Sequence, residues 1–170
     1  MARDEENLFR PPVTAARRPA DDVTRVLFVC LGNICRSPTA ECVMRRLVTD
    51  RGLEDSIEVD SAGTAAWHVG KPSDPRSVAA ALRRGVVLDG RARQVTEADF
   101  ERFDLLVAMD RANERDLIDT APSAAARAKV RLLLDDADVP DPYYGGDSGF
   151  DDVLDLVEAG CSVLLDELVA

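Results

Sequence analysis

The chain has 170 residues and a formal net charge of −11, with 46% of its residues hydrophobic and 31% charged. This length and composition are typical of one globular domain with a sizeable apolar core. The charge is uneven, because residues 135–170 hold eleven acidic residues and no lysine or arginine, whereas residues 1–134 are neutral overall. An acidic C-terminal part argues against general affinity for nucleic acid, so we expect no nucleic-acid partner.

The first 22 residues differ from the rest of the chain. They mix arginine, proline, alanine and acidic residues without periodicity, and they lack the apolar centre of a signal peptide. No stretch of the sequence reaches the length of a transmembrane helix, so no membrane partner is expected. We interpret residues 1–22 as a disordered extension and residues 23–170 as the functional domain.

The first predicted element is a buried strand that leads into a short loop. The stretch from residue 24 to residue 41 reads TRVLFVCLGNICRSPTAE. Its apolar run, residues 26–29, is typical of a parallel strand buried on both faces. Residues 31–35 then form a tight loop, in which Asn33 beside Gly32 suits a turn because asparagine tolerates the left-handed backbone region.

The helix that follows this loop is marked at both ends. Ser37 is the expected N-cap, and Pro38 suits the first helical position because its missing N–H would have no partner there. Apolar residues follow at helical spacing, and residues 51–52 (Arg-Gly) are expected to end the helix. The prediction is strand, loop and helix, with Cys30 ending the strand and Arg36 six residues later.

The rest of the chain alternates between strands and helices. Thr96 with Asp99 resembles a capping box. The further expected elements are a strand at 57–59, a loop at 64–75 with Trp67 and the single histidine His68, a helix at 77–84 stopped by Gly85, a short helix after Thr96, a strand at 105–109, a helix at 111–119, a strand at 130–134, a loop at 135–149 and a helix at 150–168. This alternation predicts an α/β fold, a four-stranded parallel sheet flanked by helices on both faces.

Residues with useful chemistry stand at or beyond the carboxyl ends of these strands. They are Cys30, Ser61, Asp110 and Asp141. Ligands of parallel sheets bind beyond these ends, so we expect one shared site. Asp110 has two interpretations at this stage, a residue that orients a loop or an ordinary turn residue.

The loop after the first strand is predicted to bind phosphate. Its backbone N–H groups and the helix dipole favour an anion, and the planar guanidinium of Arg36 can hold two phosphate oxygens. The same field favours a thiolate at Cys30, which could attack phosphorus to give a phosphocysteine without a metal or other cofactor. A buried structural cysteine and a surface arginine are the alternative, but the flanking strand and helix favour the phosphate site.

Asp141 is the candidate general acid. It lies on a loop that Pro140 and Pro142 stiffen, where a carboxylic acid could protonate the leaving oxygen. The resulting carboxylate could then deprotonate the water that attacks the phosphocysteine. An ordinary Asp-Pro turn is the alternative.

Other side chains are expected to support this site. Ser37 can donate a hydrogen bond to the thiolate while it caps the helix. Trp67 is interpreted as a wall against which an aromatic ring stacks, and Tyr143 as the opposite wall. His68 is interpreted as a residue near the rim and not as a base.

The four cysteines suggest neither a metal site nor a disulfide scaffold. Residues 30, 35, 42 and 161 have irregular spacing, so no zinc site and no secreted fold is predicted. Cys42 and Cys161 are expected to be buried, whereas Cys35 either fills space beneath the loop or forms a disulfide with oxidised Cys30. A thiolate nucleophile needs reducing surroundings, which favours the cytoplasm.

Taken together, these residues resemble the low-molecular-weight protein tyrosine phosphatases. The matching stretches are VLFVCLGNICRSPTAE, VDSAGTAAWHVGKPSDPR, GRARQVTEADF, LLVAMDRAN and VPDPYYGG, in the order of the family and within residues 24–168. The resemblance implies a metal-independent phosphatase domain, residues 23–170, that acts on protein phosphotyrosine.

The resemblance also implies a role for each matching residue. Cys30 would be the nucleophile, Arg36 the phosphate-binding residue, Ser37 the thiolate stabiliser and Asp141 the general acid. The residues expected at the substrate are Leu31, Gly32, Asn33, Ile34, Cys35, Trp67 and Tyr143, with Asn33 holding the shape of the loop. Tyr143 and Tyr144 stand where some members are phosphorylated, which implies regulation by a tyrosine kinase.

One position departs from the family pattern. Gly90 stands where many members have a histidine that braces the loop asparagine, which puts the rigidity of the Asn33 contacts in question. Three rival functions are the alternatives. An arsenate reductase would need further cysteines, which residues 43–160 lack. A protein-arginine phosphatase would favour threonine in place of Ile34, and a catalytically inactive phosphopeptide-binding module would not need the complete catalytic set.

Overall fold

The structure is a computed structural model that describes residues 22–146 and 148–170. The extension expected at residues 1–22 therefore lies outside the described residues, except for Asp22. Within the described part of the chain, no helix combines the length and apolar character needed to cross a membrane.

Four parallel strands form one sheet, which confirms the predicted fold class. The strands are β1 (Thr24–Cys30), β2 (Ile57–Gly63), β3 (Leu105–Ala108) and β4 (Val130–Leu132), in the spatial order β2-β1-β3-β4. The chain leaves β1 for β2 on one side and later returns to place β3 on the other. The carboxyl end of β1 is thus a switch point in strand order, where such sheets bind ligands.

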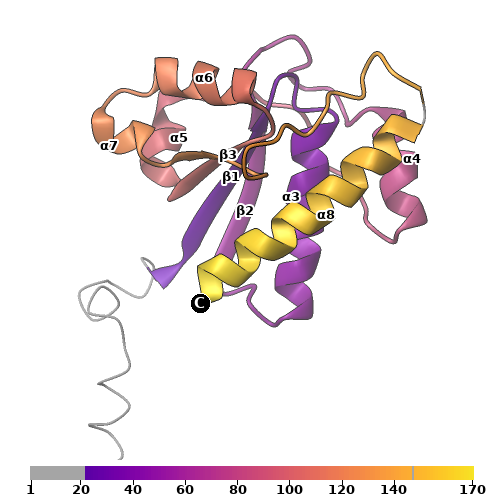
Figure 1. Cartoon of the computed structure of the whole chain (residues 1–170), viewed down its shortest axis with the longest axis horizontal. Helices are drawn as coiled ribbons and strands as arrows, with labels where there is room; N and C mark the ends of the chain where they lie inside the picture. Colours follow the sequence, from indigo (N-terminus) through magenta and orange to yellow (C-terminus); the bar gives the residue numbers. More distant parts are fainter. Residues whose placement is uncertain (1–21, 147) are drawn as a thin grey trace, which may run out of the picture.

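Helices cover both faces of the sheet (Figure 1). One face is covered by α3 (Arg36–Asp50), α4 (Pro75–Arg83) and α8 (Ser148–Val169), and the other by α5 (Glu97–Arg102), α6 (Arg111–Thr120) and α7 (Ala124–Arg127). Along β1, Val26 and Phe28 pack toward the first group, while Leu27 and Val29 pack toward the second. This two-sided burial explains the uninterrupted apolar run of β1.

The start of α3 differs from the sequence prediction. The helix begins at Arg36, its N-cap is Cys35, and no side chain makes a capping hydrogen bond. The expectation that Ser37 is the N-cap is therefore wrong, because its hydroxyl turns inward to the thiol of Cys30. Pro38 is the third helical residue, a position where its missing N–H still costs no intrahelical bond.

Other helix boundaries follow recognisable local signals. Asp74 caps α4 by accepting from the N–H of Arg76, so this helix starts two residues before the prediction. Gly85 follows α4 with φ +77°, as the predicted stop requires. The capping box of Thr96 and Asp99 is confirmed at α5. The four-residue helix α7 had no counterpart in the prediction.

Candidate active site

The nucleophile candidate Cys30 is the last residue of β1 and is 3% exposed. Its sulfur lies 2.9 Å from the hydroxyl oxygen of Ser37 and accepts a hydrogen bond from the N–H of Asn33 at 3.3 Å. In the described part of the chain, the backbone N–H groups of Gly32 and Ile34 make no hydrogen bond. These groups are available to an anion, as the predicted phosphate loop requires.

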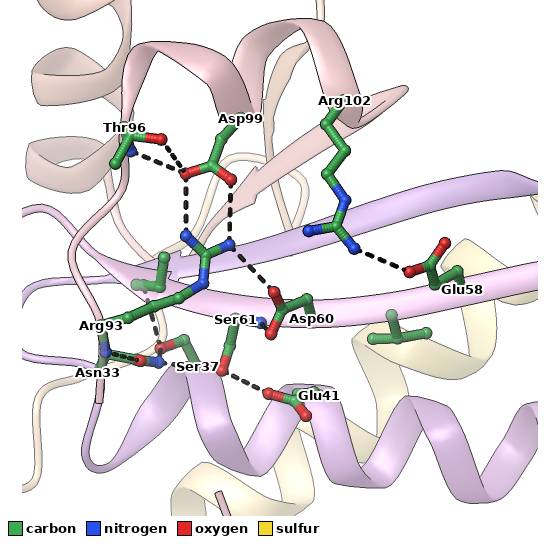
Figure 2. Close-up of polar contacts among 12 residues, drawn as sticks. Asn33, Ser37, Glu41, Glu58, Asp60, Ser61, Arg93, Thr96, Asp99 and Arg102 are labelled. Carbon is green, nitrogen blue, oxygen red and sulfur yellow. Dashed lines mark hydrogen bonds and ion pairs between the residues drawn. The ribbon is translucent and has the colours of Figure 1, made fainter. Parts of the chain in front are cut away.

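The side chain of Asn33 links this loop to neighbouring segments through hydrogen bonds (Figure 2). Its backbone has φ 56°, the left-handed conformation expected for it. Its amide nitrogen donates to the hydroxyls of Ser37 (2.8 Å) and Ser61 (3.0 Å), and its oxygen accepts from the backbone N–H of Arg93 (3.0 Å). Ser61 in turn donates to Glu41 at 2.6 Å. Asn33 is 3% exposed and does not line the pocket.

Arg93 is itself held by two carboxylates. Its guanidinium bonds Asp99 and Asp60, with 3.0 Å between the paired nitrogen and oxygen in each case (Figure 2). Burial alone would raise the pKa of Asp99, but the hydrogen bonds from Arg93 and Thr96 lower it below its ordinary value. Both polar atoms of the Asn33 side chain are thus hydrogen-bonded without a contribution from position 90. A side chain at Gly90 would meet open space.

The close approach of two loops also depends on glycine. Gly63 lies beside Cys30 in the β1–β2 register, and a Cβ there would stand 2.7 Å from the carbonyl oxygen of Leu31. The N–H groups of Thr64 and Ala65 donate to the carbonyls of Cys30 and Leu31, at 2.9 and 3.0 Å. The last residue of β2 and the two residues after it therefore pack against the predicted phosphate loop and hydrogen-bond to it.

Arg36 is almost completely buried at the opposite end of the loop. One terminal nitrogen bonds Asp110 at 2.5 Å and the carbonyl of Val139 at 3.0 Å, and the other lies 3.5 Å from Asp141. Burial would lower the pKa of Arg36, but Cys30, Asp110 and Asp141 raise it above its ordinary value. Its charge is therefore secure where a phosphate would bind.

Asp110 belongs to the site, which resolves its two interpretations. Its second carboxylate oxygen accepts from the N–H of Asn113 at 2.7 Å and caps α6. The Asp110 side chain thus caps the start of α6 and also orients Arg36. The signal in the sequence was its place at the end of β3.

One pocket brings most of the predicted residues together. Its lining consists of Cys30, Leu31, Gly32, Ile34, Cys35, Arg36, Trp67, His68, Asp141, Tyr143 and Tyr144. Trp67 is 70% exposed, so it forms part of the rim and not of the core. The carboxylate of Asp141 accepts from the N–H of Tyr143 at 3.1 Å, and its other oxygen is the one that faces Arg36.

Comparison with known proteins shows the family to which the chain belongs. A family model described as low molecular weight phosphotyrosine protein phosphatase matches residues 25–170. The chain is 50% identical over 149 residues to the low molecular weight protein-tyrosine-phosphatase of Streptomyces coelicolor, a match that covers 83% of this chain and 91% of the relative. The chain belongs to this phosphatase family.

Solved structures of related phosphatases have the same fold. The protein tyrosine phosphatase of Entamoeba histolytica, with Hepes in its active site, is 39% identical and superposes with a TM-score of 0.82, covering 85% of this chain and 96% of that one. Wzb of Vibrio vulnificus, in complex with benzylphosphonate, is 30% identical with a TM-score of 0.77, covering 85% and 98%.

The remaining cysteines of the phosphatase are buried thiols. Burial raises the pKa of Cys35 to about 12 and that of Cys42 to about 11, and it also raises the pKa of Cys161. All four cysteines are free. Cys42 and Cys161 lie in the core, as predicted, whereas Cys35 also lines the pocket.

Proposed function

We propose that this phosphatase hydrolyses protein phosphotyrosine through a phosphocysteine, without a metal or another cofactor. The observation that carries the proposal is the arrangement of three side chains around one pocket. Cys30, Arg36 and Asp141 all line the pocket. Asp141 lies next to Arg36, and the hydroxyl of Ser37 lies within hydrogen-bond distance of the Cys30 sulfur. This arrangement offers a nucleophile, an anion-binding fork and an acid to the same phosphoryl group.

In the first step, the thiolate of Cys30 attacks phosphorus and the P–O bond to tyrosine breaks. The leaving phenolate takes a proton from Asp141, while Arg36 and the loop N–H groups stabilise the equatorial oxygens. Ser37 donates a hydrogen bond to the sulfur. In the second step, water gives a proton to the Asp141 carboxylate and attacks phosphorus, which breaks the P–S bond and releases phosphate and the thiolate.

The pocket walls suit an aromatic leaving group. Trp67 and Tyr143 contribute aromatic rings to the pocket lining, and Leu31 and Ile34 of the loop add apolar surface. The structure of Wzb in complex with benzylphosphonate shows that a structural relative binds a phosphonate that carries an aromatic ring. These points favour phosphotyrosine over phosphoarginine, and phosphotyrosine proteins are the proposed partners.

The proposal extends to the surroundings of the enzyme. Four free cysteines, one of them the nucleophile, suit a reducing cytoplasm. Tyr144 is 93% exposed beside Tyr143 at the pocket, so a tyrosine kinase could reach it, and a phosphate there would add negative charge at the mouth. We propose that such modification weakens the binding of phosphotyrosine.

The test of the nucleophile is Cys30→Ser. We expect hydrolysis of phosphotyrosine peptides to be abolished while binding of inorganic phosphate stays measurable, because the hydroxyl stays protonated but Arg36 still binds the anion. Activity within about tenfold of the parent would contradict the assignment, since loss of a nucleophile costs far more. Parallel assays with phosphoarginine, with arsenate and with a chelator distinguish the rival functions and a metal requirement. The same variant can trap substrates from a lysate.

A further inference from the structure

Arg76 lies between the phosphate loop and the segment that carries Asp141. The backbone N–H of Asp74 donates to the carbonyl of Ile34, in the phosphate loop, at 2.8 Å. The Asp74 carboxylate then holds Arg76 through two hydrogen bonds, from Nε at 3.1 Å and from Nη2 at 2.9 Å. The Asp74 side chain is 7% exposed and that of Arg76 is 38% exposed, so the carboxylate of this pair is buried while the guanidinium is partly open to solvent.

The other contacts of Arg76 reach the acid loop, which we define as residues 139–146. Its Nη2 donates to the carbonyl of Tyr143 at 3.0 Å. Its guanidinium also lies over two rings, 4.6 Å from the centroid of Phe150 and 5.7 Å from that of Tyr143. Tyr143 is the residue whose N–H bonds the carboxylate of Asp141. Two successive hydrogen bonds, through the backbone of Tyr143, therefore connect Arg76 to the proposed acid.

Few other hydrogen bonds attach this part of the loop to the rest of the protein. Val139, at its start, is tied to Met109 and to Arg36. For residues 142–146, the hydrogen bonds found in the described part of the chain stay within residues 141–149, apart from the one that Arg76 makes. The far side of the acid loop thus depends on Arg76 for its hydrogen-bonded attachment to the phosphate loop.

We propose that Arg76 is a positioning residue that holds the general acid Asp141 over the phosphate loop. This inference rests on the proposed function, because it assigns no role to Arg76 except through Asp141. An arginine suits the task better than a lysine, because one planar group bonds the carboxylate with two nitrogens, reaches a carbonyl and stacks on Phe150. Displacement of an acid by about 1 Å can reduce the rate of proton transfer by up to 100-fold.

The test compares two substrates of different leaving group. The variant Arg76→Gln should reduce kcat/KM for a phosphotyrosine peptide by about tenfold, because tyrosine, with a pKa of about 10, needs a proton to leave. It should change kcat/KM for para-nitrophenyl phosphate much less, since para-nitrophenolate is stable as an anion. Competitive inhibition by inorganic phosphate should be unchanged, because the phosphate loop keeps its own contacts.

Arg83→Gln is the matched control. Arg83 lies on the same helix, its side chain is 60% exposed, and it pairs with Asp151 of α8. Among the described residues, it makes no hydrogen bond or ion pair with the acid loop. This variant should leave kcat/KM unchanged for both substrates. Equal loss on both substrates in Arg76→Gln, or weaker phosphate inhibition, would show a general structural role and overturn the inference. If Arg76→Gln does not fold, Arg76→Lys provides the same comparison. We expect Arg76→Lys to lose less kcat/KM than Arg76→Gln, again mainly for the phosphotyrosine peptide.

A double variant separates this inference from the proposed function. In an Asp141→Asn background, Arg76→Gln should cause no further loss on the phosphotyrosine peptide, because the acid it positions is already absent. If Asp141→Asn alone is selective for the poor leaving group but the two losses multiply, Asp141 is the acid and Arg76 does not act through it. If Asp141→Asn shows no such selectivity, the general-acid assignment fails and the inference fails with it.

Discussion

At the scale of single residues, the site depends on side chains that hold other side chains. Ser37 and Asn33 orient the sulfur of Cys30, and Asp110 orients Arg36. Each of these supporting groups is hydrogen-bonded on its other side to a distinct element, as with Asn113 for Asp110. The reactive groups are therefore preorganised before a substrate binds.

A second cysteine near Cys30 determines how oxidation should affect the enzyme. Cys35 lines the pocket with Cys30 and is five residues away in the same loop. We expect a sulfenic acid on Cys30 to be captured by the Cys35 thiol, forming an S–S bond and releasing water. Because burial raises the pKa of Cys35 to about 12, little thiolate exists at neutral pH and capture should accelerate as pH rises.

Intact-mass analysis after mild peroxide treatment tests this prediction. The expected product has lost two hydrogens and regains activity with a thiol reductant. Cys35→Ser should instead progress to irreversible oxygen addition. If the parent also accumulates oxygen and never forms the disulfide, Cys35 only fills space beneath the loop.

At the scale of elements, the start of α5 is part of the scaffold of the phosphate loop. Asp99 caps the helix through Thr96 and holds Arg93, whose backbone N–H bonds Asn33. A local capping motif and a tertiary ion pair thus use the same carboxylate. A substitution at the start of α5 should therefore affect both the stability of the protein and the conformation of the loop that contains Asn33.

We predict that Asp99→Asn lowers the free energy of unfolding at neutral pH by about 1.5–3 kcal/mol, the typical value for hydrogen bonds to a charged group. The pKa of Asp99 is lowered in the folded state, so its contribution is complete above its unfolded pKa of about 3.9 and is lost as pH falls through the folded value. Denaturant titrations of parent and variant should therefore converge in acid. A stability difference that is independent of pH would contradict this account.

At the scale of the whole molecule, α8 connects the acid loop to the core. It begins at Ser148, shortly after the loop, and packs along α3 (Figure 1). Its residue Gly160 lies against the two leucines that follow β4. A Cβ at Gly160 would stand 2.7 Å from Cγ of Leu133 and 3.1 Å from Cδ2 of Leu134. The glycine therefore permits a close approach between helix and sheet that another residue would prevent.

This approach predicts that Gly160→Ala destabilises the protein. Helix propensity alone would favour alanine by about 1 kcal/mol, but overpacking against Leu133 should cost about 1–3 kcal/mol. The double change Gly160→Ala with Leu133→Ala should recover part of the loss caused by Leu133→Ala, because the new methyl group fills the space that the leucine leaves. Thermal or denaturant unfolding measures both effects, and stabilisation by Gly160→Ala in the parent would show that the contact is looser than described.

Much of this protein could be predicted from the sequence because its signals are local. The apolar run of β1, the turn residues Gly32 and Asn33, and the capping box at α5 depend on backbone preferences within a few residues. The order of strands and helices then fixed the fold class and the edge where the site lies. The candidate nucleophile, the candidate phosphate-binding arginine and the candidate acid were predicted from their places after the strands.

Contacts between distant segments were decided only by the tertiary structure. The inward turn of Ser37, the pairing of Arg36 with Asp110, and the attachment of the acid loop through Arg76 join residues that lie 7 to 74 positions apart. The bracing of Asn33 by the backbone of Arg93 is of the same kind, since a main-chain N–H leaves no trace in residue identity. Such contacts depend on where whole elements pack, because hydrogen bonds act over about 3 Å and sequence spacing does not report that distance.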